Sequence, residues 1–183
     1  MTMAIACLGW GSLIWCQKAL PVIGGWQTDG PLMPIEFTRQ SNDKRITLVI
    51  TPDAPPLRTL WVALSVKTLA EAKAVLAARE GISDANIKHS LGAWSAGGGS
   101  PHGIGDWAAG KGLAHVVWTA LKPKMGTEYR TPSIAEVLAH LTGLSGHDRD
   151  RAEEYVRMTP RQITTPYRAA IEQALGWTPQ GLG

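Results

Sequence analysis

Residues Cys7–Trp15 read CLGWGSLIW, and the interpretation of the whole chain starts from this stretch. The apolar run Met3–Leu8 enters a Gly-x-Gly-Ser turn and then returns to apolar residues, which is typical of a buried strand ending in a tight loop. Because glycine adopts positive φ without a Cβ penalty, we expect Gly9 and Gly11 to turn the amides of residues 11–13 toward one point, where they hold a carboxylate. The alternative is an ordinary turn whose glycines only form the corner.

The composition predicts one globular domain with a sizeable core, since 44% of the 183 residues are hydrophobic and 18% are charged. No apolar run approaches the roughly 20 residues of a membrane span, and the N-terminus does not resemble a secretory signal. We therefore expect a cytoplasmic protein that does not bind membranes. The two cysteines, Cys7 and Cys16, fit neither a disulfide framework nor a zinc site, so we expect reduced thiols.

Several kinds of chemistry are disfavoured by the sequence. The net charge is +3, but the lysines and arginines are scattered rather than clustered, so nucleic-acid binding is not expected. The five histidines form no metal-binding motif, and we expect neither a metal nor another cofactor. Ser12 is not followed by the glycine of a hydrolase nucleophile elbow, and Gly103-Ile-Gly105 lacks the preceding strand of a dinucleotide site.

Short segments rich in β-branched and aromatic residues predict a mainly antiparallel sheet after an irregular connection at Leu20–Pro34. The predicted strands, joined as a meander with a hairpin turn at SNDK and followed later by one more strand, are Met33–Gln40, Arg45–Thr51, Leu57–Ser65 and Leu113–Leu121. Strand alternation places Arg39 on the same inward face as Ile35 and Phe37. Arg39 and Ser41 are the polar side chains of this region that we expect to contact a ligand.

A capping box, Thr68-Leu-Ala-Glu71, opens a helix that we expect to run from Thr68 to Glu80, with Gly81 closing it. Apolar residues at spacings of three and four form its core-facing stripe, and the same row continues to Glu80. Partial burial and the negative end of the helix dipole both predict a raised pKa for Glu80, which suits general acid–base catalysis. The alternatives are a side chain that swings into solvent or one that pairs with Arg79 or a basic strand residue.

The glycine-rich segment Leu91–Gly112 predicts either a lid over a site or a tolerated insertion. His115, in the strand that follows, is expected to be a hydrogen-bonded core residue rather than a ligand. The chain after this strand is predicted to be helical. Thr131 and Thr165 precede prolines at expected helix starts, and Asp148–Arg157 is expected to form a charged helix between them.

Three features, in this order along the chain, resemble the γ-glutamylcyclotransferase-like family and especially its ChaC-type branch. They are the opening GWGSLIW, the strand pair FTRQSNDKRITLVI, and LAAREGI at the helix end before the final strand, and they cover about Met3–Leu121. The resemblance implies a single α+β domain over residues 1–183, with a small mixed, mainly antiparallel β-barrel and flanking helices. Residues 122–183 are then a helical C-terminal extension that packs on the barrel or forms a homo-oligomer.

The resemblance also implies an activity and a set of site residues. Glu80 acts as general acid and base. The substrate is a small γ-glutamyl amine or peptide, whose carboxylate end is held by the loop residues Trp10, Gly11, Ser12 and Leu13. The substrate's own amine attacks its γ-carbonyl, which gives 5-oxoproline and a free amine. Trp10 stands where the family has a tyrosine, and the alternative is a binding module of the same fold that holds a carboxylate ligand without turning it over.

Overall fold

The computed structural model describes residues 4–180, and its contacts group the chain into two compact units. The first unit comprises the described parts of Met1–Gly9, Cys16–Met33 and Arg58–Leu121. The second unit comprises the described parts of Trp10–Trp15, Pro34–Leu57 and Lys122–Gly183. The expected arrangement, a single domain with residues 122–183 packed on it, stays a prediction.

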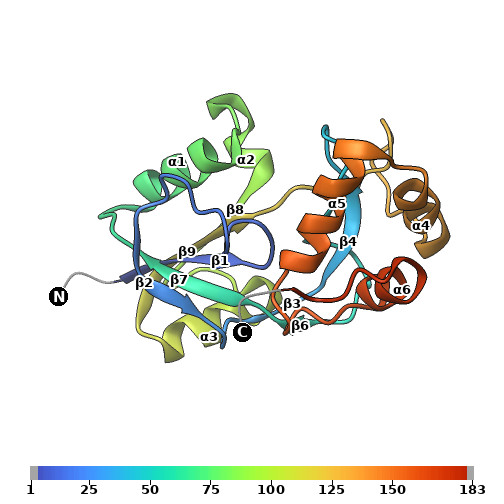
Figure 1. The fold of residues 1–183 in the computed structure, drawn as a ribbon. Coiled ribbons are helices and arrows are strands. Elements are labelled where there is room, and N and C mark those ends of the chain that lie inside the picture. Colours follow the sequence, from blue (N-terminus) through green and yellow to red (C-terminus); the bar gives the residue numbers. More distant parts are fainter. Residues whose placement is uncertain (1–3, 181–183) are drawn as a thin grey trace. The chain divides into compact units, whose positions relative to one another are not determined.

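A five-stranded sheet with the order β2-β7-β1-β9-β8 organises the first unit (Figure 1). Its strands are β1 (Ala4–Gly9), β2 (Val22–Gln27), β7 (Leu60–Leu64), β8 (Leu91–Ser95) and β9 (Leu113–Thr119). β1 pairs in parallel with β9, whereas the other pairings are antiparallel. The structure thus confirms a mixed, mainly antiparallel α+β fold. The expected closed barrel is not present in residues 4–180, because the sheet is open with β2 and β8 at its edges.

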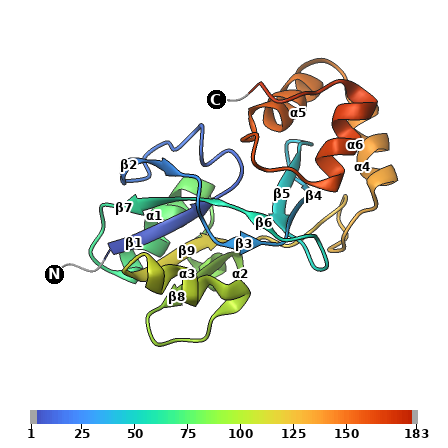
Figure 2. The same ribbon diagram turned by 90° about the horizontal axis from the view of Figure 1, so that it is seen from below.

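Both faces of this sheet are covered, and this explains why β1 reads as a continuous apolar run. Helix α1 (Leu69–Glu80) and helix α3 (Ile104–Gly110) lie on opposite faces (Figures 1 and 2). α1 packs on β1, β8 and β9, and α3 packs on β8 and β9. Ile5, Cys7 and Leu8 are each at most 2% exposed, so residues of both faces of β1 belong to the core.

Helix α1 is the element that the sequence predicts best. Thr68 is its N-cap, and the Thr68 hydroxyl accepts a hydrogen bond from the Glu71 amide while the Glu71 carboxylate accepts one from the Thr68 amide. Gly81 follows Glu80 in the left-handed conformation (φ 69°) and ends the helix. A one-turn 3₁₀ helix (Asp84–Asn86) and the short helix α2 (Ile87–Ser90) lead from there into β8.

The predicted irregular connection Leu20–Pro34 is wrong, because it contains β2 and the short strand β3 (Leu32–Met33). β3 forms a two-stranded sheet with β6 (Leu57–Arg58). β2 was not predicted because it contains two glycines, which are uncommon in strands. Gly24 has φ 72°, and the pairing of β2 with β7 is irregular between Ile23 and Gln27, as expected at a bulged edge.

The predicted meander is also wrong in its third strand. β7 pairs with β1 and β2 rather than with β5 (Ile46–Ile50), so the chain leaves the hairpin after β5. The intervening segment TPDAPP contains three prolines, which lack the N–H that a sheet ladder requires. The sequence pattern predicted strands at the positions of β4, β5 and β7, but not the long-range partners of β7.

The glycine-rich segment Leu91–Gly112 contains regular secondary structure that packs in the first unit, and its role as a lid or an insertion stays a prediction. It contains β8, a 3₁₀ turn (Pro101–Gly103) and α3, whose Ile104 and Ala108 are completely buried. Gly92 lies against the Trp118 indole, and a Cβ at this position would meet the ring at 2.1 Å. A glycine is therefore required here by close packing, and not by flexibility.

The second unit is built on the predicted hairpin of β4 (Ile35–Gln40) and β5. At its turn, the Ser41 amide donates to the Arg45 carbonyl at 2.9 Å. The register shifts between Phe37 and Arg39, so the strict alternation expected along β4 is broken by a bulge. Arg39 is consequently half-exposed rather than directed inward with Phe37.

Three helices complete the second unit and confirm the helical C-terminal region: α4 (Ile134–Thr142), α5 (Gly146–Met158) and α6 (Pro166–Leu175). α5 packs on β5, and α6 packs on β4 and α4 (Figures 1 and 2). Thr165 caps α6 ahead of Pro166, as predicted, with its hydroxyl accepting from the Arg168 amide. Of the helices that the structure describes, none has the length and apolarity to cross a membrane.

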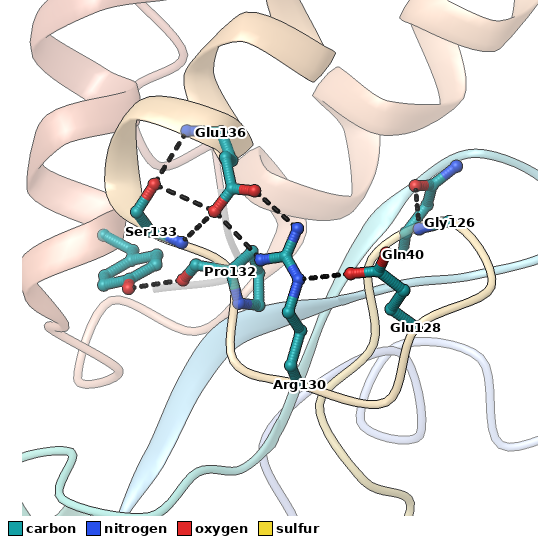
Figure 3. Close-up of polar contacts among 8 residues, drawn as sticks. Gln40, Gly126, Glu128, Arg130, Pro132, Ser133 and Glu136 are labelled. Carbon is teal, nitrogen blue, oxygen red and sulfur yellow. Dashed lines mark hydrogen bonds and ion pairs between the residues drawn. The ribbon is translucent and has the colours of Figure 1, made fainter.

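The cap of α4 differs from the prediction, because Ser133 and not Thr131 occupies it (Figure 3). Ser133 and Glu136 form a capping box in which the Glu136 carboxylate accepts from the Ser133 amide at 2.8 Å. Arg130 bridges that carboxylate and the carboxylate of Glu128, at 2.6 and 2.7 Å (Figure 3). The proline after Thr131 was a correct boundary signal, but the helix starts at Ile134, two residues beyond the proline.

Candidate active site

Glu80, the predicted catalytic residue, lies in the first unit at the last position of α1. Its side chain is 19% exposed, so the partial burial expected from the helical row is confirmed. Glu80 Oε1 accepts a hydrogen bond from Arg79 Nη1 at 2.7 Å. The ion pair with Arg79, one of the alternatives that the sequence left open, is therefore present.

Arg79 is more deeply buried than Glu80, with only 6% of its side chain exposed. The buried stripe of α1 includes Ala72 and Leu76, and a step of three from Leu76 leads to Arg79. Its guanidinium also binds the backbone of the first unit, because Nε and Nη2 both donate to the carbonyl oxygen of Cys16. A buried cation and a half-buried carboxylate thus adjoin each other at one helix end.

Both charges of this pair affect the pKa of Cys7 in β1. Burial raises the pKa of the Cys7 thiol far above its usual value, the Glu80 charge raises it further, and the Arg79 charge lowers it. The thiol is completely buried and stays protonated at neutral pH. Cys7 is therefore a core residue beside the Arg79–Glu80 pair, not a nucleophile, and the structure confirms free thiols at Cys7 and Cys16.

The opening loop belongs to the second unit and begins with the turn Gly11–Ile14, closed by a hydrogen bond from the Ile14 amide to the Gly11 carbonyl at 3.0 Å. Gly9 is the last residue of β1, and Gly11 does not adopt positive φ. The conformational reason that we expected for these glycines is therefore wrong. The role of the loop amides as a carboxylate clamp stays a prediction.

The actual requirement for glycine at position 11 is the close approach of Tyr155 from α5. A Cβ on Gly11 would lie 2.3 Å from Tyr155 Oη. The same hydroxyl accepts a hydrogen bond from the Leu48 amide at 3.2 Å, and the ring packs edge-on against Trp15 and Phe37. Tyr155 thus joins the loop, the hairpin and α5 within the second unit.

Trp10 is also part of the core of the second unit. Its side chain is 4% exposed, and its indole Nε1 donates to the Leu48 carbonyl at 3.2 Å. Leu13 is 6% exposed, whereas Ser12 is half-buried. Among the four predicted loop residues, Ser12 is the one whose side chain is most accessible to a ligand.

Arg39 and Ser41, the other two predicted ligand-binding residues, both bind protein groups. Arg39 Nη1 donates to the Lys122 carbonyl at 2.7 Å. The Ser41 hydroxyl lies within hydrogen-bonding distance of both the Asp43 carboxylate and the Arg45 carbonyl, which fixes the hairpin turn. These contacts give both side chains a structural role in the second unit, and their contact with a substrate stays a prediction.

The predicted site residues are thus divided, with Glu80 in the first unit and the loop, Arg39 and Ser41 in the second. Their assembly into one site stays a prediction. Two further residues make many of the contacts in their own units: Arg79, which the sequence analysis named only as a possible partner of Glu80, and Tyr155, which it did not consider. The helical spacing could have indicated that Arg79 is buried, because it lies three residues after Leu76. Tyr155 lies in the charged sequence DRDRAEEYVR, which is typical of a solvent-exposed helix face.

Residues 4–180 contain no group of three or more His, Cys, Asp or Glu side chains that could hold a metal ion. His115 is half-buried, with its Nδ1 2.9 Å from the Ser95 hydroxyl, which confirms the expected hydrogen-bonded histidine.

Comparisons with known proteins complete this description. No protein-family profile and no curated protein sequence matches the chain. Among solved structures, the crystal structure of a γ-glutamyl cyclotransferase specific to glutathione from yeast is similar to it at 11% identity. The alignment covers 94% of this chain and 98% of the yeast chain, with a TM-score of 0.43.

Proposed function

We propose that the protein is a γ-glutamylcyclotransferase-like enzyme that cyclises the γ-glutamyl group of a small amine or peptide to 5-oxoproline. The observation that carries the proposal is the position of Glu80. It is a half-buried carboxylate at a helix end, held through one oxygen by a buried guanidinium. The proposal of a γ-glutamyl substrate rests on the resemblance carried by GWGSLIW, the hairpin and LAAREGI in this order along the chain.

In the proposed reaction, the Glu80 carboxylate takes a proton from the α-amine of the substrate. The amine nitrogen attacks the γ-carbonyl carbon and forms the new C–N bond of a five-membered ring. The bond from that carbon to the leaving nitrogen then breaks, and Glu80 returns the proton to the leaving amine. The products are 5-oxoproline and a free amine or peptide, and Glu80 ends the cycle as it began.

For this reaction the protein has to orient the substrate and to transfer one proton. The nucleophile belongs to the substrate, so the protein has to hold the γ-glutamyl chain in its curled conformation, which is an effect of proximity and orientation. A positioned general acid–base contributes about 10²- to 10⁴-fold to such a rate. In the proposal, the loop residues 10–13 bind the carboxylate end of the substrate and Glu80 moves the proton.

The direct test is to incubate the purified protein with a panel of γ-glutamyl amines and peptides and to quantify 5-oxoproline. We expect product from at least one compound and a loss of about 10²- to 10⁴-fold in Glu80→Gln. Glu154→Gln is the matched control, because Glu154 is an exposed carboxylate on α5. Equal product formation by Glu80→Gln and the wild type would exclude the assigned role of Glu80.

A second candidate function is a binding module that holds a small carboxylate ligand without turnover. The contact that favours it is the Arg79–Glu80 ion pair, since a paired carboxylate also serves a purely structural role. Titration calorimetry separates the two functions. Saturable binding of a γ-glutamyl compound that is afterwards recovered intact supports the binding module.

A further inference from the structure

We propose that Arg79 is the positioning residue for Glu80, fixing the carboxylate at the end of α1 in the orientation that proton transfer requires. This inference rests on the proposed function of Glu80 and goes beyond it, because it assigns a role to a second residue. Its basis is the set of contacts that the Arg79 guanidinium makes within the first unit.

The first step of the argument is the geometry of the guanidinium. One edge of the planar fork, Nε and Nη2, binds the Cys16 carbonyl, with Nε at 3.1 Å. The remaining nitrogen, Nη1, binds Glu80 Oε1 at 2.7 Å. Because the guanidinium is rigid and planar, its binding to the Cys16 carbonyl also determines where Nη1 presents its proton.

The second step is the position of the pair in the helix. The last residues of a helix fray unless they are tied down, and Glu80 is the final residue of α1. Arg79 ties this end to the segment that starts at Cys16, and the Arg79 carbonyl in turn accepts a hydrogen bond from Lys18 Nζ at 3.5 Å. The side chain of Arg79 is 94% buried by these and its other contacts, so the anchor is not a surface ion pair.

The third step is that the two oxygens of the Glu80 carboxylate have different surroundings. Oε1 is occupied by Arg79, and within the described residues no other hydrogen bond to the Glu80 carboxylate is seen. Oε2 is thus the oxygen that is left for a substrate amine. A carboxylate held by one oxygen keeps its second oxygen in a fixed direction, which is the condition for efficient proton transfer.

Among the described residues, the following charged and titratable groups lie on the elements that contact α1 near Glu80. α1 packs on β1, β8 and β9. β1 contributes Cys7, whose thiol stays protonated because burial and the Glu80 charge raise its pKa. β9 contributes His115, which the strand register places on the same face as Cys7 and which lies against Ser95 of β8. Arg79 and Lys18 are the cations in contact with the helix end.

The test compares Arg79→Lys and Arg79→Gln with the control Lys73→Gln, which removes a positive charge from the same helix without touching Glu80. We expect kcat to fall by about 10- to 100-fold in both Arg79 variants while KM changes less than threefold. Lysine keeps the charge but not the fork, so a loss in Arg79→Lys is specific to positioning.

A further readout distinguishes positioning from mere stability. Millimolar guanidinium should restore part of the activity of an Arg79→Ala variant and should leave the activity of Lys73→Gln unchanged. Wild-type kcat in both Arg79→Lys and Arg79→Gln overturns the inference.

Failure of the proposed function is recognised separately, because it leaves the wild type without 5-oxoproline formation. In that case hydrogen exchange decides the inference. Arg79→Lys should accelerate amide exchange at the end of α1 and in the segment after Cys16, and Lys73→Gln should not. Unchanged exchange at both places contradicts the anchoring role of Arg79, whatever reaction the protein catalyses.

Discussion

Among the described residues, each unit has one buried arginine, and the two arginines make different contacts. Arg79 of the first unit donates to the Cys16 carbonyl and to the Glu80 carboxylate. Arg168 of the second unit is 2% exposed and donates to four carbonyls, those of Val156, Thr159, Pro160 and Ile163. Arg168 therefore mainly satisfies backbone groups at the end of α5 and in the segment that follows, and it also pairs with Glu172 of its own helix at 3.1 Å, whereas Arg79 holds the carboxylate of the residue next to it.

The glutamates of the two units show the same contrast. Glu36 of β4 is 2% exposed, and its carboxylate accepts hydrogen bonds from the amides of Phe37 and Tyr167 and from the Thr165 hydroxyl. Both of its oxygens are used at the N-terminus of α6, where a carboxylate complements the helix dipole. Glu80 is partly exposed and is held through one oxygen. Full burial with both oxygens bound indicates a structural carboxylate, and partial burial with one oxygen bound suits a reactive one.

The largest effect is expected from a substitution of Arg168, which tests whether this arginine has a structural role. Arg168→Met removes a donor from four carbonyls and the cation paired with Glu172, and we expect a loss of about 3–5 kcal/mol in the free energy of unfolding. Urea denaturation measures this loss. Arg161→Met, at an exposed arginine, serves as the control and should change stability by less than about 0.5 kcal/mol. A similar small effect at Arg168 contradicts the structural role assigned to it.

A second experiment asks whether the opening loop is fixed by packing against Tyr155. Gly11→Ala places a methyl group 2.3 Å from Tyr155 Oη, and we expect a loss of about 1–3 kcal/mol. Tyr155→Phe removes the clashing oxygen together with the acceptor of the Leu48 amide. The double variant should therefore be less destabilised than the sum of the single variants, as a double-mutant cycle in urea will show. Additive losses argue against the close contact.

A third experiment uses pH to separate Glu36 from Glu80. Burial raises the pKa of the Glu36 carboxyl above its usual 4.5, against the opposing effect of its hydrogen-bond donors. The folded state then binds the proton more tightly than the unfolded state. The resulting stability is fully present below about pH 4.5 and is lost as the pH rises through the raised pKa.

Glu36→Gln should thus cost about 1–2 kcal/mol at pH 4.5 and less at pH 7.5, because only the wild type loses stability over this interval. Denaturation at the two pH values measures the difference. Glu154→Gln, at an exposed carboxylate, should show no such trend. A cost that grows toward pH 7.5 contradicts a raised pKa at Glu36.

The sequence predicted those parts of the fold that local interactions determine. The capping box at Thr68, the end of α1 at Gly81 and the cap at Thr165 all depend on residues within one helical turn, and all are confirmed. The partners of β7 were not predictable in this way, since pairing with β1 joins residues more than 50 positions apart. Strand propensity identifies a strand, but tertiary packing selects its neighbour.

The same limit applies to the candidate site. Glu80 could be singled out because its helix is defined locally and its place in the helical row follows from spacing. Arg79 could not be assigned its role, because that role depends on a carbonyl at Cys16, 63 residues away. The role of Tyr155 could not be predicted either, because the helical pattern of α5 does not show that its hydroxyl lies against Gly11.

The smallest expected effect comes from the two capping boxes. Thr68→Ala in α1 and Ser133→Ala in α4 each remove a side-chain acceptor from a helix N-terminus, and each should cost about 1 kcal/mol. Thr68 lies at the opposite end of α1 from Glu80. If Glu80 is positioned by Arg79 at the helix end, Thr68→Ala should lower the urea midpoint and leave kcat for 5-oxoproline formation unchanged. A parallel fall in kcat means instead that the whole helix, and not its anchored end, sets the position of the carboxylate.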